Sequence, residues 1–147
     1  MSIFTDEYFM RQALAEAQQA MEAGEIPVGA VVTFGDRLIA RAHNLTEALQ
    51  DPTAHAEMQA ITAATQQVGG KYLKDCTLYV SLEPCPMCAG ALYWAQVGRL
   101  VYASADPKRG YSQVSTKLLH PKTEVKTGVL AAEASGLLQH FFQLKRN

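Results

Sequence analysis

Two cysteines three positions apart, in the segment Pro84-Cys85-Pro86-Met87-Cys88, are the clearest candidates for chemistry. At the first turn of a helix this spacing puts both sulfur atoms on one side. The positive end of the helix also lowers the pKa of a thiol and so favours the thiolate that binds metal ions. The motif alone fits three structures: a redox-active thiol pair, half of a zinc site, or two buried thiols.

A histidine and a carboxylate, His55 and Glu57, form a second candidate pair. On a regular helix, residues two apart point roughly 200° from each other, so this pair alone is typical of a surface. Both pairs, however, open a helix that follows a strand or a loop leaving one, which allows them to lie at one edge of a sheet. His55, Cys85 and Cys88 then supply three zinc ligands and leave the fourth tetrahedral position to water.

An open, catalytic zinc site is the better interpretation, because a structural zinc site needs a fourth protein ligand. Cys76 is expected within a strand, away from the cluster, and the remaining histidines have no paired spacing with it. A bound zinc lowers the pKa of its water towards about 7, and Glu57 can take that proton and return it to a leaving group. The sequence therefore predicts a hydrolase with one zinc per chain; a non-catalytic zinc or redox module is the alternative.

The elements that must position these residues alternate between helix and strand. Thr5 and Thr53 are predicted to cap helices, and two apolar runs around Gly35-Asp36 predict a β-hairpin. The predicted helices are 5–24, 53–69, 84–96 and 129–146, and the predicted strands are 28–34, 37–43, 76–82 and 99–103. Residues 105–123 are expected to be irregular. This order predicts a mixed sheet covered on both faces.

Length and composition set the class of protein. With 147 residues, 48% of them hydrophobic and 18% charged, residues 1–147 are expected to form a single domain. No run of about 18 apolar residues is present, so no membrane span is expected, and the N-terminus carries no secretory pattern, which favours the cytoplasm. Three cysteines are too few for a disulfide framework and leave thiols free for metal or chemistry.

The net charge of −1 hides an asymmetry between the two halves of the chain. Residues 1–70 hold 3 Lys and Arg against 9 Asp and Glu, whereas residues 71–147 hold 10 against 5. A polyanion could therefore dock on one side of the molecule. The alternative is that folding interleaves the halves and mixes the charges.

Longer motifs carry a resemblance to a known family. They are residues 26–32 (IPVGAVV), Asn44, residues 51–57 (DPTAHAE), residues 78–85 (LYVSLEPC) and residues 87–91 (MCAGA). With them the chain resembles the zinc-dependent cytidine and nucleobase deaminases, and is most similar to bacterial tRNA adenosine deaminases, over nearly its whole length. The resemblance implies a three-layer α/β/α sandwich of cytidine-deaminase type with a mixed five-stranded sheet. It also implies hydrolytic deamination of adenosine to inosine in a tRNA anticodon loop.

The same resemblance implies a role for each candidate residue. His55, Cys85 and Cys88 become the zinc ligands, and Glu57 becomes the catalytic proton shuttle. Two further positions match residues that hold the base: Asn44, which would hydrogen-bond the purine ring, and Val28, which would form part of the wall against it. Asp106 and Lys108 match a loop that meets the flanking nucleotides.

Other features bear on the substrate and the assembly. Residues 109–115 (RGYSQVS) depart from the small-residue stretch typical of the tRNA enzymes, and residues 86–88 with Tyr93 and Trp94 are similar to deaminases of free guanine. Deamination of free guanine, cytosine or a nucleoside is therefore the alternative function. The C-terminal segment, with Phe141-Phe142 and Lys145-Arg146, again resembles the tRNA enzymes, and the resemblance implies a homodimer.

Overall fold

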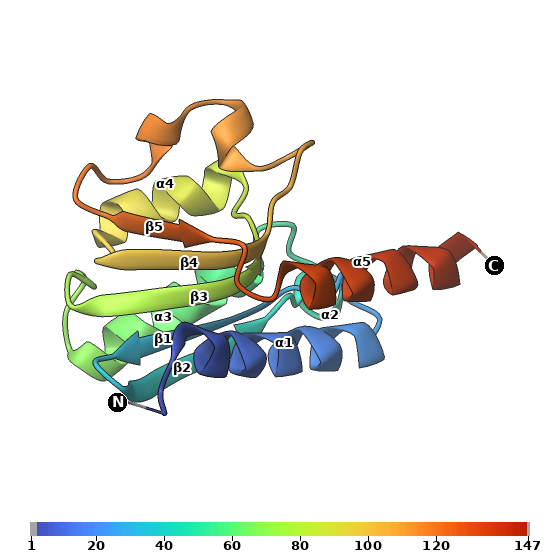
Figure 1. The fold of residues 1–147 in the computed structure, drawn as a ribbon, viewed down its shortest axis with the longest axis horizontal. Coiled ribbons are helices and arrows are strands. Elements are labelled where there is room, and N and C mark those ends of the chain that lie inside the picture. The colour runs from blue at the N-terminus through green and yellow to red at the C-terminus, as the bar shows by residue number, and fades with distance from the viewer. Residues whose placement is uncertain (1–2, 147) are drawn as a thin grey trace.

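A computed structural model describes residues 3–146 as one sheet with helices on both faces (Figure 1). In chain order the elements are α1 (Asp6–Glu22), β1 (Gly29–Phe34), β2 (Arg37–His43), α2 (Thr46–Leu49), α3 (Ala56–Val68), β3 (Cys76–Leu82), α4 (Pro86–Ala95), β4 (Arg99–Ser104), β5 (Glu124–Thr127) and α5 (Ala131–Arg146). Two short 3₁₀ turns, Tyr111–Gln113 and Thr116–Leu118, lie between β4 and β5. This arrangement confirms the predicted α/β/α sandwich.

The sheet has the strand order β2-β1-β3-β4-β5, and it is mixed as predicted. β1 pairs antiparallel with both β2 and β3, whereas β3, β4 and β5 run parallel. β2 therefore runs in the same direction as β3 and β4, so the carboxyl ends of these three strands meet at one edge. The residue pattern did not locate β5, because all four of its residues are exposed and it has no apolar alternation.

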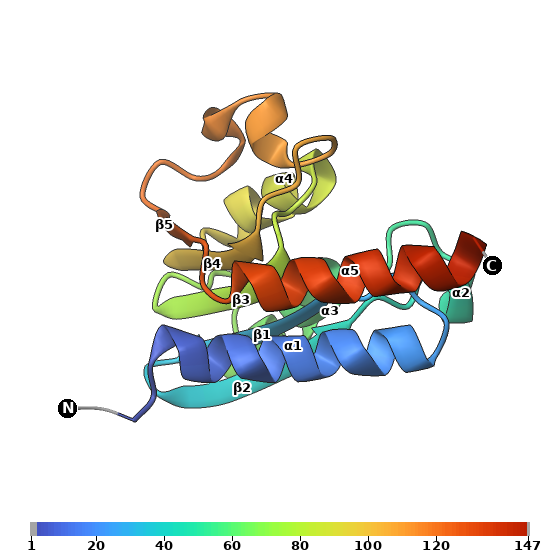
Figure 2. The same ribbon diagram turned by 45° about the vertical axis from the view of Figure 1, so that its right-hand side comes forward.

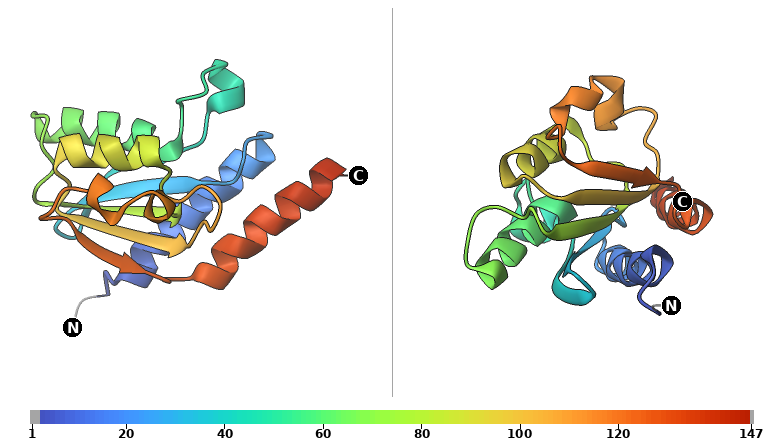
Figure 3. Two further views of the ribbon diagram at one scale, coloured as in Figure 1. Left: turned by 90° about the horizontal axis from the view of Figure 1, so that it is seen from above. Right: turned by 60° about the vertical axis from the view of Figure 1, so that its left-hand side comes forward.

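The helices form the two outer layers (Figures 2 and 3). α1 and α5 lie side by side on one face, and α3 and α4 cover the other. Along β3, Leu78 and Val80 join the core under α3 and α4, while Tyr79 joins the core under α1 and α5. The sequence of a strand that is buried on both faces is a nearly continuous run of apolar residues, which is why β3 was the clearest strand in the sequence.

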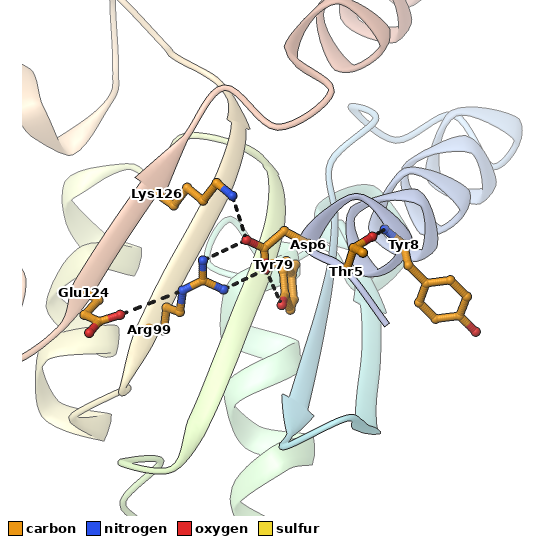
Figure 4. A network of polar contacts seen from close by, with 7 residues as sticks. All are labelled: Thr5, Asp6, Tyr8, Tyr79, Arg99, Glu124 and Lys126. Carbon is orange, nitrogen blue, oxygen red and sulfur yellow. Dashed lines mark hydrogen bonds and ion pairs between the residues drawn. The ribbon is translucent and has the colours of Figure 1, made fainter. Parts of the chain in front are cut away.

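A polar cluster ties the start of α1 to the sheet (Figure 4). The Asp6 carboxylate accepts two hydrogen bonds of 2.7 Å from the Arg99 guanidinium, one of 2.9 Å from the Tyr79 hydroxyl and one of 3.0 Å from the Lys126 ammonium. The Arg99 hydrogen bonds hold the pKa of Asp6 well below its usual range. Two cations of the basic half are thus paired with an acid of the other half, so the charges mix on this face.

Several predicted element boundaries are wrong. Thr53 does not cap the second helix: α3 begins at Ala56, His55 is its N-cap residue, and the Thr53 hydroxyl bonds instead to Asp51. The third helix begins at Pro86, with Cys85 as its N-cap residue, two positions later than predicted. The N-cap of α1 at Thr5 is confirmed, since its hydroxyl accepts the Tyr8 N–H at 3.1 Å.

The described residues contain no helix that is both long and apolar enough to cross a membrane.

Candidate metal centre and active site

The predicted metal ligands lie together at the edge of the sheet where β2, β3 and β4 end. His55 directly precedes α3, which follows the loop after β2, and Cys85 directly precedes α4, which follows β3. Cys88 lies one turn further along α4 and is completely buried. Cys76 opens β3 at the other end of that strand and lies outside this group.

The spacing of the three ligand atoms suits zinc. His55 Nδ1 lies 3.6 Å from Cys85 Sγ and 3.4 Å from Cys88 Sγ, and all three atoms lie within 4.8 Å of one another. Ligands on a tetrahedral zinc with bonds of about 2.0–2.3 Å are separated by roughly 3.5 Å. One imidazole and two sulfurs are also a common zinc donor set, and three protein ligands leave a position open for substrate or water.

The electrostatics of the pair of cysteines favours a thiolate. The Cys88 thiol donates a hydrogen bond to Cys85, which lowers the pKa of Cys85 to about 5 and raises the pKa of Cys88. The backbone N–H groups of Met87 and Cys88, in the first turn of α4, also stabilise the Cys85 thiolate. Both effects favour the thiolate form of Cys85, which is the form that binds zinc.

His55 and Glu57 reach the same site because they do not share a helix. His55 has extended backbone angles, φ −73° and ψ 155°, and only Glu57 lies within the first turn of α3. The angle of roughly 200° expected for two residues of one helix therefore does not apply. Glu57 is buried, and burial raises its pKa to about 7.

Asn44, at the end of β2, caps α3 from a distance. Its Oδ1 accepts the backbone N–H of Ala56 at 2.8 Å, and its Nδ2 donates to the carbonyl of Ile26 at 3.1 Å. The N-cap residue itself, His55, makes no capping hydrogen bond, because its ring is turned towards the cysteines. One Nδ2 hydrogen of Asn44 is left over, and the residue borders the cavity described next.

A cavity of about 750 Å³ opens beside the ligand group. Seven of the eight residues that the sequence singled out line it, namely Val28, Asn44, His55, Glu57, Cys85, Asp106 and Lys108, and Cys88 is buried behind them. α5 closes one side with Ser135, Leu138, Gln139 and Phe142, which lie on one helical face. Phe141 belongs to the core, whereas Phe142 is half-exposed at the cavity.

Asp106 and Lys108 both lie at the mouth of the cavity, but they differ in their contacts. Asp106 Oδ1 accepts the backbone N–H groups of Lys108 and Arg109 at 3.1 and 3.0 Å, so this carboxylate shapes its own turn. The Lys108 and Arg109 side chains are exposed there and free to face an anionic ligand.

Two buried carboxylates near the cavity were missed in the sequence. Glu25, next to the cavity residue Ile26, accepts the N–H groups of Glu47 and Ala48 at 3.0 and 2.8 Å and so ties α2 to the segment before β1. Glu83 lines the cavity and holds the segment after β4. For Glu83 a signal was present: a charged residue directly after the apolar strand 76–82, where solvent exposure is not expected.

The sheet, the His-Cys-Cys group and the adjacent carboxylate define a zinc-dependent deaminase site. The model for the cytidine and deoxycytidylate deaminase zinc-binding region matches residues 4–104, and the chain belongs to this family. It is 46% identical over 143 residues to the tRNA-specific adenosine deaminase of Bacillus subtilis, covering 94% of this chain and 89% of that protein.

Two solved structures extend the comparison. One comes from a study of A-to-I editing by tRNA:A34 deaminases at the wobble position; it has a TM-score of 0.82 and 39% identity, and covers 89% of this chain and 99% of that one. The guanine deaminase of Nitrosomonas europaea has a TM-score of 0.80 and 26% identity, covering 93% and 84%. The fold is thus shared by enzymes for both substrates considered from the sequence.

Proposed function

We propose that this protein is a zinc-dependent hydrolase that deaminates adenosine to inosine in the anticodon loop of tRNA. The observation that carries the proposal is the cavity, which joins the His-Cys-Cys group and Glu57 to a mouth lined by Lys108 and Arg109. Similarity to tRNA-specific adenosine deaminases over most of the chain supports the same substrate. The reaction consumes water and releases ammonia.

His55, Cys85 and Cys88 would hold the zinc. When bound, the zinc would make a water-derived nucleophile available at neutral pH. Glu57 would transfer two protons in turn: the first passes from the attacking water to the purine ring nitrogen, and the second passes from the new hydroxyl group on the ring carbon to the amine, which leaves as ammonia. With a pKa of about 7 the Glu57 carboxyl both accepts and returns a proton without a large free-energy cost.

The base is held by the residues around this centre. The free N–H of Asn44 donates to the purine ring, and Val28 packs against the face of the base. Because Asn44 also caps α3, the group that binds the base is hydrogen-bonded to the helix that carries Glu57. Substrate and proton shuttle are therefore placed relative to each other by one side chain.

The RNA docks through cations at the cavity mouth and at the end of α5: Lys108, Arg109, Lys145 and Arg146. Each phosphate contact to single-stranded nucleic acid contributes a slope of about −0.7 to the dependence of log affinity on log salt. Replacing all four with Ala should weaken binding of an anticodon stem-loop and flatten the slope by up to about 3. Zinc content and melting temperature should change little, because these side chains are exposed.

Deamination of free guanine is the second candidate, favoured by the structural similarity to the Nitrosomonas europaea enzyme. A direct comparison separates the two: ammonia release from purified protein offered free guanine, free adenosine, an anticodon stem-loop and a scrambled hairpin. We expect rapid release from the stem-loop alone. Ready deamination of guanine, with no preference for the stem-loop over the scrambled hairpin, would replace the tRNA proposal by the small-molecule one.

We further propose that residues 1–147 act as one deaminase domain, that the enzyme works in the cytoplasm, where tRNA is processed, and that it is a homodimer. The exposed side chains of α4 support the dimer: Trp94 is 77% exposed, and Met87 and Tyr93 are each 37% exposed. Trp94 is therefore not a core residue, and an exposed apolar group of this kind is typical of an interface. Light scattering should give twice the 16.0 kDa chain mass at micromolar concentration, and a monomer would contradict the proposal.

A further inference from the structure

Glu83 is a buried carboxylate, and within residues 3–146 the donors to its oxygens all come from one segment, residues 106–112 after β4. Its Oε1 accepts the backbone N–H of Asp106 at 3.1 Å. Its Oε2 accepts both the backbone N–H and the hydroxyl of Ser112, at 3.0 and 2.7 Å. The carboxylate thus joins two points six residues apart and closes residues 106–112 into a loop.

Backbone contacts place this loop against the start of α4. The Glu83 N–H donates to the Ser104 carbonyl at 2.8 Å, and the Tyr111 N–H donates to the Pro84 carbonyl at 2.8 Å. Glu83 stands two residues before the zinc ligand Cys85, so the position of the loop is tied to the metal centre through one short stretch of backbone.

Gly110 shows how closely the loop packs on the carboxylate. Its φ of −64° and ψ of 148° are open to any residue, so its backbone conformation does not require glycine. A Cβ at this position would instead lie 2.3 Å from the carboxyl carbon of Glu83, far inside van der Waals contact. Space for the Glu83 carboxylate, not backbone strain, is therefore what requires glycine at position 110.

The loop that Glu83 closes carries the exposed cations of the cavity mouth. Lys108 and Arg109 lie between the two anchored points, and both line the cavity. This stretch overlaps residues 109–115, where the sequence departs from the small-residue pattern of the tRNA enzymes. Ser112 lies within this departing stretch, and it donates two of the three hydrogen bonds that Glu83 accepts.

We propose that Glu83 is a positioning residue that fixes the loop 106–112 at the mouth of the cavity and thereby sets where the RNA flanking the target base docks. The proposal rests on the tRNA function proposed above. Glu83 acts through Lys108 and Arg109, so it governs affinity for the stem-loop more than the chemical step.

The first test is Glu83→Gln, which keeps the shape of the side chain but turns one acceptor oxygen into a donor that faces N–H groups. We expect KM for an anticodon stem-loop to rise by about 10-fold or more, kcat to fall by less than about 3-fold, and the salt slope of binding to flatten. Zinc per chain, measured by metal analysis, should stay near the wild-type value. Two results would overturn the proposal. One is a loss of zinc that parallels the loss of activity, and the other is a fall in kcat of about 10-fold or more with KM unchanged.

Asp6→Asn is the matched control, because it also removes a carboxylate that accepts several hydrogen bonds, but at the opposite end of β4: Asp6 binds Arg99, which opens that strand, whereas Glu83 lies beside Ser104, which closes it. It should lower the melting temperature while leaving KM and the salt slope unchanged. If it raises KM as much as Glu83→Gln does, the effect of Glu83→Gln is a general loss of stability and the positioning role is refuted.

A double-mutant cycle tests the packing directly. Gly110→Ala should raise KM and lower the melting temperature in the wild-type background, because the new methyl group displaces the loop or the carboxylate. In the Glu83→Ala background the methyl group has room, so Gly110→Ala should add almost nothing to either quantity. Additive effects of the two changes would show that the loop does not rest on Glu83.

The cycle also separates this proposal from the proposed function. Coupling in melting temperature does not depend on any substrate, whereas the KM and salt measurements require RNA. If the wild type does not deaminate the stem-loop, but Gly110→Ala and Glu83→Ala are coupled in melting temperature, the RNA-docking role and the tRNA function are both refuted. If the wild type deaminates the stem-loop normally, but the two changes are not coupled in melting temperature, only the role of Glu83 is refuted.

Discussion

Replacing Asn44 with Ala removes the hydrogen bonds that join two parts of the active site. The side chain links the Ile26 carbonyl, just before β1, to the Ala56 N–H, the first helical residue of α3. Both contacts span distant parts of the chain, and Asn44 itself is buried. Truncation leaves the Ala56 N–H without its partner, whereas the Ile26 carbonyl loses one hydrogen bond but still accepts the Val28 N–H at 2.8 Å.

The cost follows from these two groups. An unsatisfied buried N–H at Ala56 costs about 1–3 kcal/mol, and the hydrogen bond lost from the Ile26 carbonyl costs about 0.5–1.5 kcal/mol, so together they set a range of about 1.5–4.5 kcal/mol. Asn44 borders the cavity, where water can reach the freed groups, which places the expected loss of unfolding free energy in the lower half, about 2–3 kcal/mol. For a chain of this size each kcal/mol lowers the melting temperature by about 2–4 °C, so a decrease of roughly 4–12 °C is expected.

The assay is thermal unfolding of zinc-saturated protein, with stem-loop deamination measured on the same samples. Thr53→Ala is the control, because the sequence predicted Thr53 as the cap of this helix, whereas its hydroxyl bonds only to Asp51 on the surface. We expect Thr53→Ala to cost less than about 1 kcal/mol, and Asn44→Ala to lower kcat/KM by at least about 10²-fold. A melting temperature for Asn44→Ala within about 2 °C of wild type, with a larger decrease for Thr53→Ala, would refute the capping assignment.

Three further predictions concern the metal, the proton shuttle and the polar cluster at α1. Cys85→Ser or Cys88→Ser should lose both zinc and activity, and a variant that stays active without metal would contradict the ligand assignment. Glu57→Gln should keep zinc and melting temperature but lower kcat by about 10²–10⁴-fold; near-normal turnover would remove Glu57 from the mechanism. Asp6→Asn should cost about 2–3 kcal/mol at pH 7, because it leaves the Arg99 guanidinium without its close partner. The pKa of Asp6 is lowered on folding, so its contribution is complete above the unfolded value of about 3.9 and is lost progressively as the pH falls from there towards the lower folded value. Urea unfolding should show a constant difference between wild type and variant above about pH 5 and a shrinking difference below about pH 4.

The zinc centre could be predicted from local sequence because its residues are set by chemistry that tolerates few alternatives. Thiol sulfurs at i and i+3 and an imidazole are a donor set that zinc selects, and Glu57 lies two residues from His55 in the sequence. The strands β1 to β4 were visible for a related reason: burial on one or both faces leaves an apolar pattern of period two or a continuous apolar run. Strand β5 left no such pattern, because it is an exposed edge strand.

The sequence by itself therefore determined the class of chemistry, the candidate metal ligands and the layered α/β/α fold. Only the tertiary structure decided which side chains support that chemistry from a distance. Asn44 caps a helix that begins twelve residues later, and Glu83 closes a loop that begins more than twenty residues later. Such contacts depend on which strand ends meet at one edge of the sheet, and that is set by strand order and direction. No local period or spacing in the chain encodes them.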